Sequence, residues 1–171
     1  DIKDDKPNKT FIQSIIKLGH ESPLEHASAT FKISGVSRSL THQLVRHRLS
    51  SFTQLSQRYV KEDKFGYVTP PSLLVPGLKE KYDNCMSNLQ ELYNEFIAAG
   101  VKKEDARYIL PNACETTIWM TCNLRQWRSV IKLRSDSHAQ WEIRQMSDII
   151  LFELYKVFPI VFEDLKEKFI K

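Results

Sequence analysis

The chain has 171 residues, 42% of them hydrophobic, and its 25 Lys and Arg against 21 Asp and Glu leave a net charge of +4. Such a chain forms one domain with a hydrophobic core, or two very small ones, and is not disordered. No run approaches the ~20 apolar residues of a membrane span, and no basic and apolar signal peptide opens the chain. Three cysteines without paired spacing predict reduced thiols in a cytoplasmic protein, not a disulfide framework or a zinc site.

The first half of the sequence predicts two helices and a strand. Apolar residues at helical spacing favour helices over residues 10–18 and 36–48. Strict alternation of apolar and polar residues over 27–34 predicts a half-buried strand. Two further segments, one rich in Ser, Thr and Gln and one rich in Pro, are predicted to lack long regular elements: 49–58 and 61–76.

The second half predicts four helices and a second strand. Helical patterns run over residues 78–99 and from 103 to Pro111, and residues 116–122 favour a strand. Asn123 can cap a helix that reaches Leu133.

A capping box is predicted at the start of the last long helix, where Ser137 precedes Gln140 by three residues. Behind it an apolar stripe runs to Val157 and ends before Pro159, which predicts core or a subunit interface. Together these elements predict a helix-rich α+β fold, a single domain over residues 1–171 with a small, mostly antiparallel sheet.

The glycines exclude the two common nucleotide-binding motifs. All five stand alone, so neither GxGxxG nor GxxxxGK can be written from them. If the protein binds a nucleotide, side chains must therefore hold the phosphates. The isolated glycines are Gly19, Gly35, Gly66, Gly77 and Gly100.

Positive charge is concentrated in one window, since no Asp or Glu occurs from His26 to Lys61. A window of this length fits either an anionic ligand or a simple charged surface. Consecutive side chains diverge by about 100° on a helix, so Arg46, His47 and Arg48 serve different groups or lie where the helix ends. A second basic cluster lies downstream: Arg125, Arg128, Lys132 and Arg134.

The histidines outside these clusters give no metal-ligand pattern. His20 and His26 bracket Glu25 but form neither HxxxH nor HExxH, so no metal site is expected. His138, expected in the first turn of the last long helix, fits a capping or packing residue, or a residue at an anion site.

Four separated motifs resemble those of the flavin-dependent thymidylate synthases. Arg46-His47-Arg48 is followed, after seven residues, by Ser56, and the similarity extends from Gly19 to about Phe162. The other three motifs are Gly19-His20-Glu21-Ser22-Pro23-Leu24-Glu25-His26, Leu110-Pro111-Asn112 and Leu133-Arg134-Ser135-Asp136-Ser137-His138-Ala139-Gln140-Trp141-Glu142-Ile143.

The resemblance implies an enzyme, a methyltransferase that converts dUMP to dTMP. It implies methylenetetrahydrofolate as carbon donor, reduced FAD as hydride donor and NADPH as the reductant of the flavin. It also implies the fold of that family and a homotetramer with interfacial active sites, without a nucleic-acid or membrane partner. No enzyme nucleophile is implied, because Arg134 activates dUMP by stabilising negative charge on the pyrimidine.

The resemblance also assigns residues to the two ligands. Residues matched to dUMP are Gln43, Arg46, Gln54, Leu55, Ser56, Gln57, Arg58, Arg107 and Arg134. Residues matched to FAD are His20, Ser22, Arg46, His47, Arg48, Gln54, Asn123, Arg125, Ser129 and His138.

Two departures from the family pattern accompany these matches. Gln54 stands where members often have Glu, and the N-terminal strand segment of the family is expected to be missing from this chain. Two rival interpretations predict a colourless protein. The basic segment 36–58 would bind a nucleic-acid backbone, or it would dock an acidic protein partner.

Overall fold

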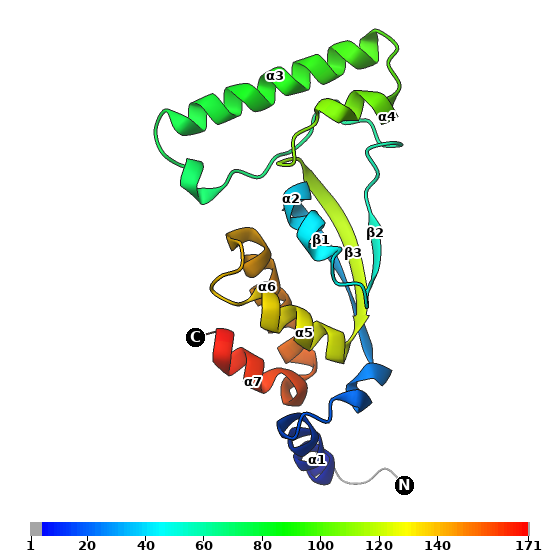
Figure 1. Cartoon of the computed structure of the whole chain (residues 1–171), viewed down its shortest axis with the longest axis vertical. Coiled ribbons are helices and arrows are strands. Elements are labelled where there is room, and N and C mark those ends of the chain that lie inside the picture. Colours follow the sequence, from blue (N-terminus) through cyan, green and yellow to red (C-terminus); the bar gives the residue numbers. More distant parts are fainter. Residues whose placement is uncertain (1–4, 171) are drawn as a thin grey trace. The chain divides into compact units, whose positions relative to one another are not determined.

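The computed structural model describes residues 5–170, with side chains described from residue 9 onward. This part of the chain forms helices and a small sheet (Figure 1). The helices are α1 (Asp5–Lys17), α2 (Arg38–Leu44), α3 (Leu78–Ala98), α4 (Lys103–Ala106), α5 (Leu124–Arg134), α6 (Trp141–Val157) and α7 (Pro159–Phe169). The strands are β1 (Ser28–Ser37), β2 (Ser51–Gln54) and β3 (Glu115–Asn123), and the 3-10 turns are Ser22–His26, Pro71–Leu73 and Arg107–Ile109.

The sheet has the strand order β1-β3-β2 and is antiparallel. Its register shows in two pairs of side chains: the hydroxyls of Thr30 and Thr121 lie 2.9 Å apart, and Thr117 donates to Ser34 at 3.3 Å. As one strand advances by four residues the other retreats by four, as antiparallel pairing requires. The prediction of a helix-rich α+β fold with a small antiparallel sheet is confirmed.

The chain divides into two compact units. The first unit comprises the residues up to 31, residues 44–51 and the residues from 120 onward. The second unit comprises residues 32–43 and 52–119. Strands β1 and β3 contribute residues to both. The single domain over residues 1–171 stays a prediction.

The first unit is built on the packing of α5, α6 and α7 (Figure 1). Their apolar faces bury Trp127, Ile131, Leu151 and Phe162. The indole of Trp127 donates to the carbonyl of Ala29 at 3.0 Å, which joins α5 to the start of β1. Apolar residues at helical spacing therefore form one core between these helices.

The second unit contains α3, which buries only Met86 and Tyr93 among its 21 residues. Side chains of α3 instead hold the irregular segment that precedes the helix. Gln90 accepts from the backbone of Phe65 at 2.7 Å and donates to the carbonyl of Glu62 at 2.8 Å. The prediction that 61–76 lacks a long regular element is confirmed.

Capping explains where three helices begin. Ser37 accepts from the N–H of Leu40 at 3.0 Å, so α2 starts at Arg38, later than predicted. Asn123 caps α5 as predicted, accepting from Gln126 at 2.8 Å. The predicted capping box is wrong, because Gln140 itself caps α6 and accepts from Glu142 and Ile143. Helix α6 therefore begins after His138, which lies in the preceding turn.

Other boundaries also differ from the predictions. The helix predicted over 36–48 ends at Leu44, so residues 46–48 lie beyond a helix end. Part of the segment predicted as a loop over 49–58 forms β2, because its backbone pairs with β3. Helix α7 was missed: Pro159 ends the preceding pattern but also fits the first turn of a new helix.

The cysteines and the hydrophobic helices give two further results. All three thiols are free: Cys85 is exposed, whereas Cys114 and Cys122 are buried. Burial raises the pKa of Cys114 and of Cys122 to about 12. Among the described residues no helix has the length and apolar character needed to cross a membrane.

One buried cation joins three segments of the first unit. The Arg128 side chain, 1% exposed, forms two hydrogen bonds of 2.7 Å with Asp164 and one of 3.1 Å with Glu21. It also donates to the carbonyl of Val161. This guanidinium therefore fixes α7 and the segment around Glu21 against α5.

We expect Arg128→Met to lower the free energy of unfolding by about 3 kcal/mol, because it leaves two carboxylates without their buried cation. Urea unfolding measures this. Arg125→Met is the control, since Arg125 pairs with Glu25 in a half-exposed pair that contributes at most about 1 kcal/mol. Equal losses in the two variants would contradict a structural role for Arg128.

Candidate functional site

The two units separate the residues that the resemblance assigns to the two ligands. Of the ten residues matched to FAD, nine lie in the first unit, and only Gln54 lies in the second. Of the nine matched to dUMP, seven lie in the second unit, while Arg46 and Arg134 lie in the first. Most residues matched to one ligand therefore share a unit.

A pocket in the first unit has a volume of about 670 Å³. Three residues matched to FAD line it, all from the beginning of α5: Asn123, Arg125 and Ser129. The other lining residues are Glu21, Glu25, Leu49, Gln126 and Lys132. The structure thus places three residues from the predicted flavin set along one cavity.

Carboxylates of the first unit already neutralise the cations of this pocket. Arg125 pairs with Glu25, and Lys132 lies 3.3 Å from Glu21. The side chains of Arg125 and Glu25 are both about half exposed, so their pair is weak in water. An anionic ligand can therefore compete for Arg125 at low cost.

The turn Ser22–His26 carries the first resemblance motif. Leu24 is buried under it, whereas His20 and Ser22 are exposed. Between them, Glu21 is held by Arg128 and Lys132. The ion pairs of Glu21 therefore fix the backbone that presents both predicted flavin residues.

The Arg46-His47-Arg48 triplet follows the end of α2, so the prediction that it lies where a helix ends is confirmed. Arg46 and Arg48 are exposed, whereas His47 is buried, with 9% of its surface accessible. Its ring Nε2 accepts a hydrogen bond of 3.0 Å from Nε of Arg134. The three side chains therefore do not form one cationic cluster, and the central one faces α5.

Burial lowers the pKa of His47 from 6.5 to about 4, and the nearby positive charge of Arg134 contributes to the same shift. The histidine is therefore neutral at pH 7, as its role of acceptor at Nε2 requires. Burial and the charge of Arg46 also lower the pKa of Arg134. This guanidinium, proposed from the resemblance as the catalytic group, thus lies beside a neutral hydrogen-bond acceptor.

His138, unlike His47, is exposed to solvent. Its side chain is 96% exposed, and its Nδ1 lies 2.8 Å from a carboxylate oxygen of Asp136. The same oxygen accepts from the backbone N–H of His138 at 2.9 Å. The ring is therefore oriented by a short turn and not by a helix N-terminus.

In the second unit, residues 54–58 begin at the last residue of the edge strand β2 and are here called the dUMP loop, after the ligand that the resemblance assigns to them. The amide nitrogen of Gln54 donates to the hydroxyls of Thr41 and Thr116, at 3.1 and 3.4 Å. The hydroxyl of Ser56 accepts from the N–H of Arg58 at 3.2 Å. Gln57 is buried, and its amide nitrogen has no partner among the described residues.

Glu104 connects two arginines of the dUMP set and was missed by the sequence analysis. Its carboxylate accepts from Nε of Arg58 at 2.7 Å, and its backbone carbonyl accepts from Nε of Arg107 at 3.1 Å. Gln43 lies half-buried in the last turn of α2. Only the spacing of three between Glu104 and Arg107 signals part of this cluster in the sequence.

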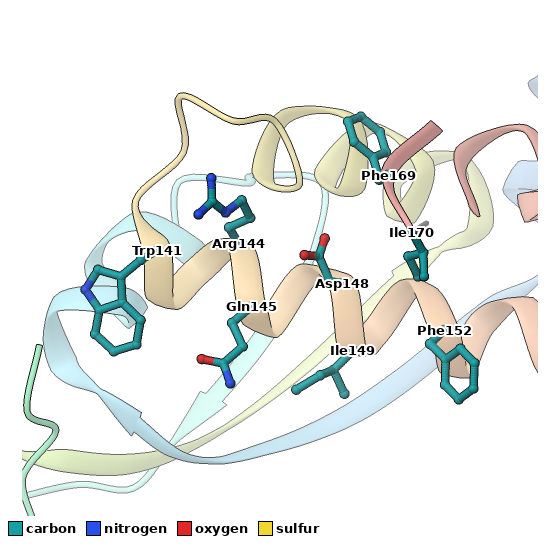
Figure 2. A pocket seen from close by; sticks show the side chains of 8 residues that line it. All are labelled: Trp141, Arg144, Gln145, Asp148, Ile149, Phe152, Phe169 and Ile170. Atoms are coloured by element: carbon teal, nitrogen blue, oxygen red, sulfur yellow. The ribbon is translucent and has the colours of Figure 1, made fainter. Parts of the chain in front are cut away.

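A second pocket of the first unit, about 700 Å³ in volume, contains none of the predicted site residues. Figure 2 shows Trp141, Ile149 and Phe152 along α6, with Phe169 and Ile170 from the end of the chain. Ile149 is 57% and Phe152 46% exposed. Both residues lie outside the predicted apolar stripe, whose Ile143, Ile150 and Leu154 are buried, and they are not covered by the described part of the chain.

Comparison with known proteins identifies the family. The sequence matches the thymidylate synthase complementing protein family over residues 1–160. The chain therefore belongs to this family, and the resemblance found in its motifs is confirmed.

Three similar relatives are each named flavin-dependent thymidylate synthase, a methyltransferase enzyme. The protein from Clostridium tetani is 43% identical over 95% of this chain and 72% of its own length. The protein from Geobacter sulfurreducens is 43% identical over 90% of this chain and 68% of its own length. The protein from Pyrococcus furiosus is 47% identical over 83% of this chain and 60% of its own length.

The lowered pKa of His47 predicts a loss of stability in acid. A proton is taken up on unfolding between pH 6.5 and about 4, so the stabilisation present above pH 6.5 disappears as the pH falls to 4. One pKa unit corresponds to about 1.4 kcal/mol. We therefore expect the free energy of unfolding to fall less on acidification in His47→Gln than in the parent, by roughly 2–3 kcal/mol. Urea unfolding at pH 7, 5.5 and 4 measures it.

The matched control is His138→Gln, which removes an exposed histidine and should keep the acid loss of the parent protein. A His47→Gln protein with the same pH dependence as the parent would contradict a neutral, buried His47.

Proposed function

We propose that this chain, as a single cytoplasmic domain, methylates dUMP to dTMP. The carbon comes from methylenetetrahydrofolate, and NADPH reduces the flavin. One observation carries the proposal: in a member of this family, nine of the ten residues matched to FAD lie in the first unit, and seven of the nine matched to dUMP lie in the second.

The residues of the first unit fit a large anionic cofactor such as FAD. Asn123, Arg125 and Ser129 offer amide, guanidinium and hydroxyl groups along one pocket. The exposed Arg46 and Arg48 add positive charge for a pyrophosphate, which this chain must bind without a glycine-rich loop. When bound and reduced, FAD supplies the hydride of the new methyl group.

The residues of the second unit fit a nucleoside monophosphate. Ser56 and Arg58 are our proposed phosphate ligands, because a hydroxyl and a planar guanidinium there are held by one short turn. Arg58 is half exposed and paired with Glu104, so a phosphate has to compete with that carboxylate. Arg107, joined to the same Glu104, is proposed to contact the pyrimidine.

Arg134 is the proposed catalytic residue. C5 of dUMP becomes nucleophilic as negative charge develops around N3 and the pyrimidine oxygens, and a guanidinium stabilises that charge. The hydrogen bond to neutral His47 orients Arg134 through Nε. No enzyme nucleophile is required, and Ser56 accepts a backbone hydrogen bond instead of facing a base.

We propose a homotetramer whose active sites form between subunits, with no nucleic-acid or membrane partner. The exposed apolar pocket along α6 supports this assembly, because contiguous apolar side chains of this kind are typical of subunit contacts. A tetramer would also let the exposed Arg46 and Arg48 serve sites other than the one that contains Arg134.

The proposed function is tested first by the flavin spectrum and by product formation. We expect bands near ~450 nm that survive gel filtration with FAD and shift on addition of dUMP. We then expect dTMP from dUMP, methylenetetrahydrofolate and NADPH. Arg134→Gln should retain the flavin bands and lose about 100-fold in rate. A folded tetramer that stays colourless in saturating FAD would overturn the proposal.

Ser56→Ala should weaken dUMP binding about tenfold, because one phosphate hydrogen bond is lost, while turnover at saturating dUMP remains measurable. A dUMP titration of the flavin spectrum and the dTMP assay give both values. Ser51→Ala, in the exposed part of β2, is the control and should bind dUMP normally. Complete loss of chemistry with intact dUMP binding would show that Ser56 takes part in the reaction.

A further inference from the structure

We propose that Arg38, which belongs to none of the resemblance motifs, is the positioning residue of the dUMP loop. Its Nη2 donates to the backbone carbonyl of Leu55 at 3.0 Å. This role rests on the proposed function, because the loop that Arg38 holds is the one proposed to bind dUMP.

The contact fixes the loop just before the proposed phosphate ligands. The N–H of Leu55 donates to the carbonyl of Thr117 at 2.9 Å, so Arg38 and β3 together hold both backbone groups of this residue. A turn begins at the next residue, Ser56, whose carbonyl accepts from the N–H of Val60 at 3.0 Å. A shift of the Leu55 carbonyl would therefore move the Ser56 hydroxyl and the Arg58 backbone together.

Arg38 is itself held firmly. It opens α2 directly after β1, and its N–H donates to the carbonyl of Cys114 at 3.0 Å. Its carbonyl accepts from the hydroxyl of Thr41 at 2.9 Å, and the same hydroxyl accepts from Gln54. The start of α2 therefore contacts the dUMP loop at two successive residues, Gln54 and Leu55.

The backbone of Glu62, an acidic residue whose charge acts on Arg38, is held by α3. Partial burial lowers the pKa of Arg38; nearby Glu62 opposes this effect, whereas Arg107 adds to it. The backbone of Glu62 donates to the hydroxyl of Tyr93 at 3.3 Å and accepts from Gln90 at 2.8 Å. Helix α3 thus holds the backbone of Glu62, whose charge acts on Arg38, and Arg38 holds the dUMP loop.

The guanidinium of Arg38 contributes little to the stability of the fold. Its Nε is buried without a hydrogen-bond partner among the described residues, so a donor is left unsatisfied beneath the loop. Desolvating a cation in exchange for a carbonyl contact stabilises a fold poorly. The same contact is well suited to fix the position of a loop whose hydroxyl and guanidinium must meet a phosphate.

Equilibrium dialysis of dUMP against the FAD-loaded protein tests this role. We expect Arg38→Ala to weaken dUMP binding about tenfold, with flavin content unchanged and kcat at saturating dUMP within about threefold of the parent. Arg38→Lys should recover part of the affinity. Free guanidinium at low millimolar concentration should restore dUMP binding to Arg38→Ala, whereas the same concentration of potassium chloride should not.

Lys79→Ala is the control, because Lys79 is a cation of the second unit whose ion-pair partner, Asp83, lies one turn away in α3. It should leave dUMP affinity unchanged and show no response to guanidinium. If Arg38→Ala does not fold, Arg38→Lys and Arg38→Gln are compared in the same dialysis, and only the glutamine variant should bind dUMP weakly.

Normal dUMP affinity in folded Arg38→Ala or Arg38→Gln would overturn the proposal. So would an equal loss of FAD and dUMP together with a lowered melting temperature, because that pattern marks a purely structural residue. If the parent protein itself binds no dUMP, the proposed function fails, and the two failures are thus distinguished.

Discussion

The pairing of β1 with β3 is the constraint on which the remaining structure depends. Each strand contributes residues to both units, and each leads directly into a helix that carries site residues. Strand β1 ends at Ser37, which caps α2, and Arg38 follows. Strand β3 ends at Asn123, which caps α5 and lines the pocket of the first unit. Because each cap is the last residue of its strand, the start of each helix is fixed by the end of its own strand.

Within this frame, arginines replace the glycine-rich loops that the sequence lacks. They fall into two groups by the partner that holds them. Arg58 and Arg125 pair with carboxylates at half-exposed positions, where an incoming anion can exchange with the carboxylate. Arg128 makes the same kind of pair but is buried, so its pair holds the fold. Exposure therefore separates the ion pairs proposed to yield to a ligand from the structural pair of Arg128, which has the same chemistry.

Local signals in the sequence predicted most helices, two of the three strands and the cap of α5. The missed elements have a different origin. Strand β2 exists because its polar segment pairs with β3, a contact about 60 residues away that no local pattern encodes. The same holds for the site: the motifs name Leu55 and Arg58, but their partners Arg38 and Glu104 lie 17 and 46 residues away. Burial, which makes His47 neutral between two exposed arginines, is equally invisible in three consecutive letters.

The positioning of Arg134 and Arg38 follows one physical rule. A neutral acceptor fixes a guanidinium through a directional hydrogen bond and adds no charge of its own. Arg134 donates to a neutral imidazole, and Arg38 donates to a backbone carbonyl. A neutral acceptor suits Arg134, whose proposed role is to stabilise charge that appears only in the transition state. For Arg38, the hydrogen bond to the Leu55 carbonyl lets one side chain fix the backbone of the loop. His47 can serve in this way only because burial keeps it uncharged, so the desolvation of one histidine and the reactivity of one arginine are parts of the same arrangement.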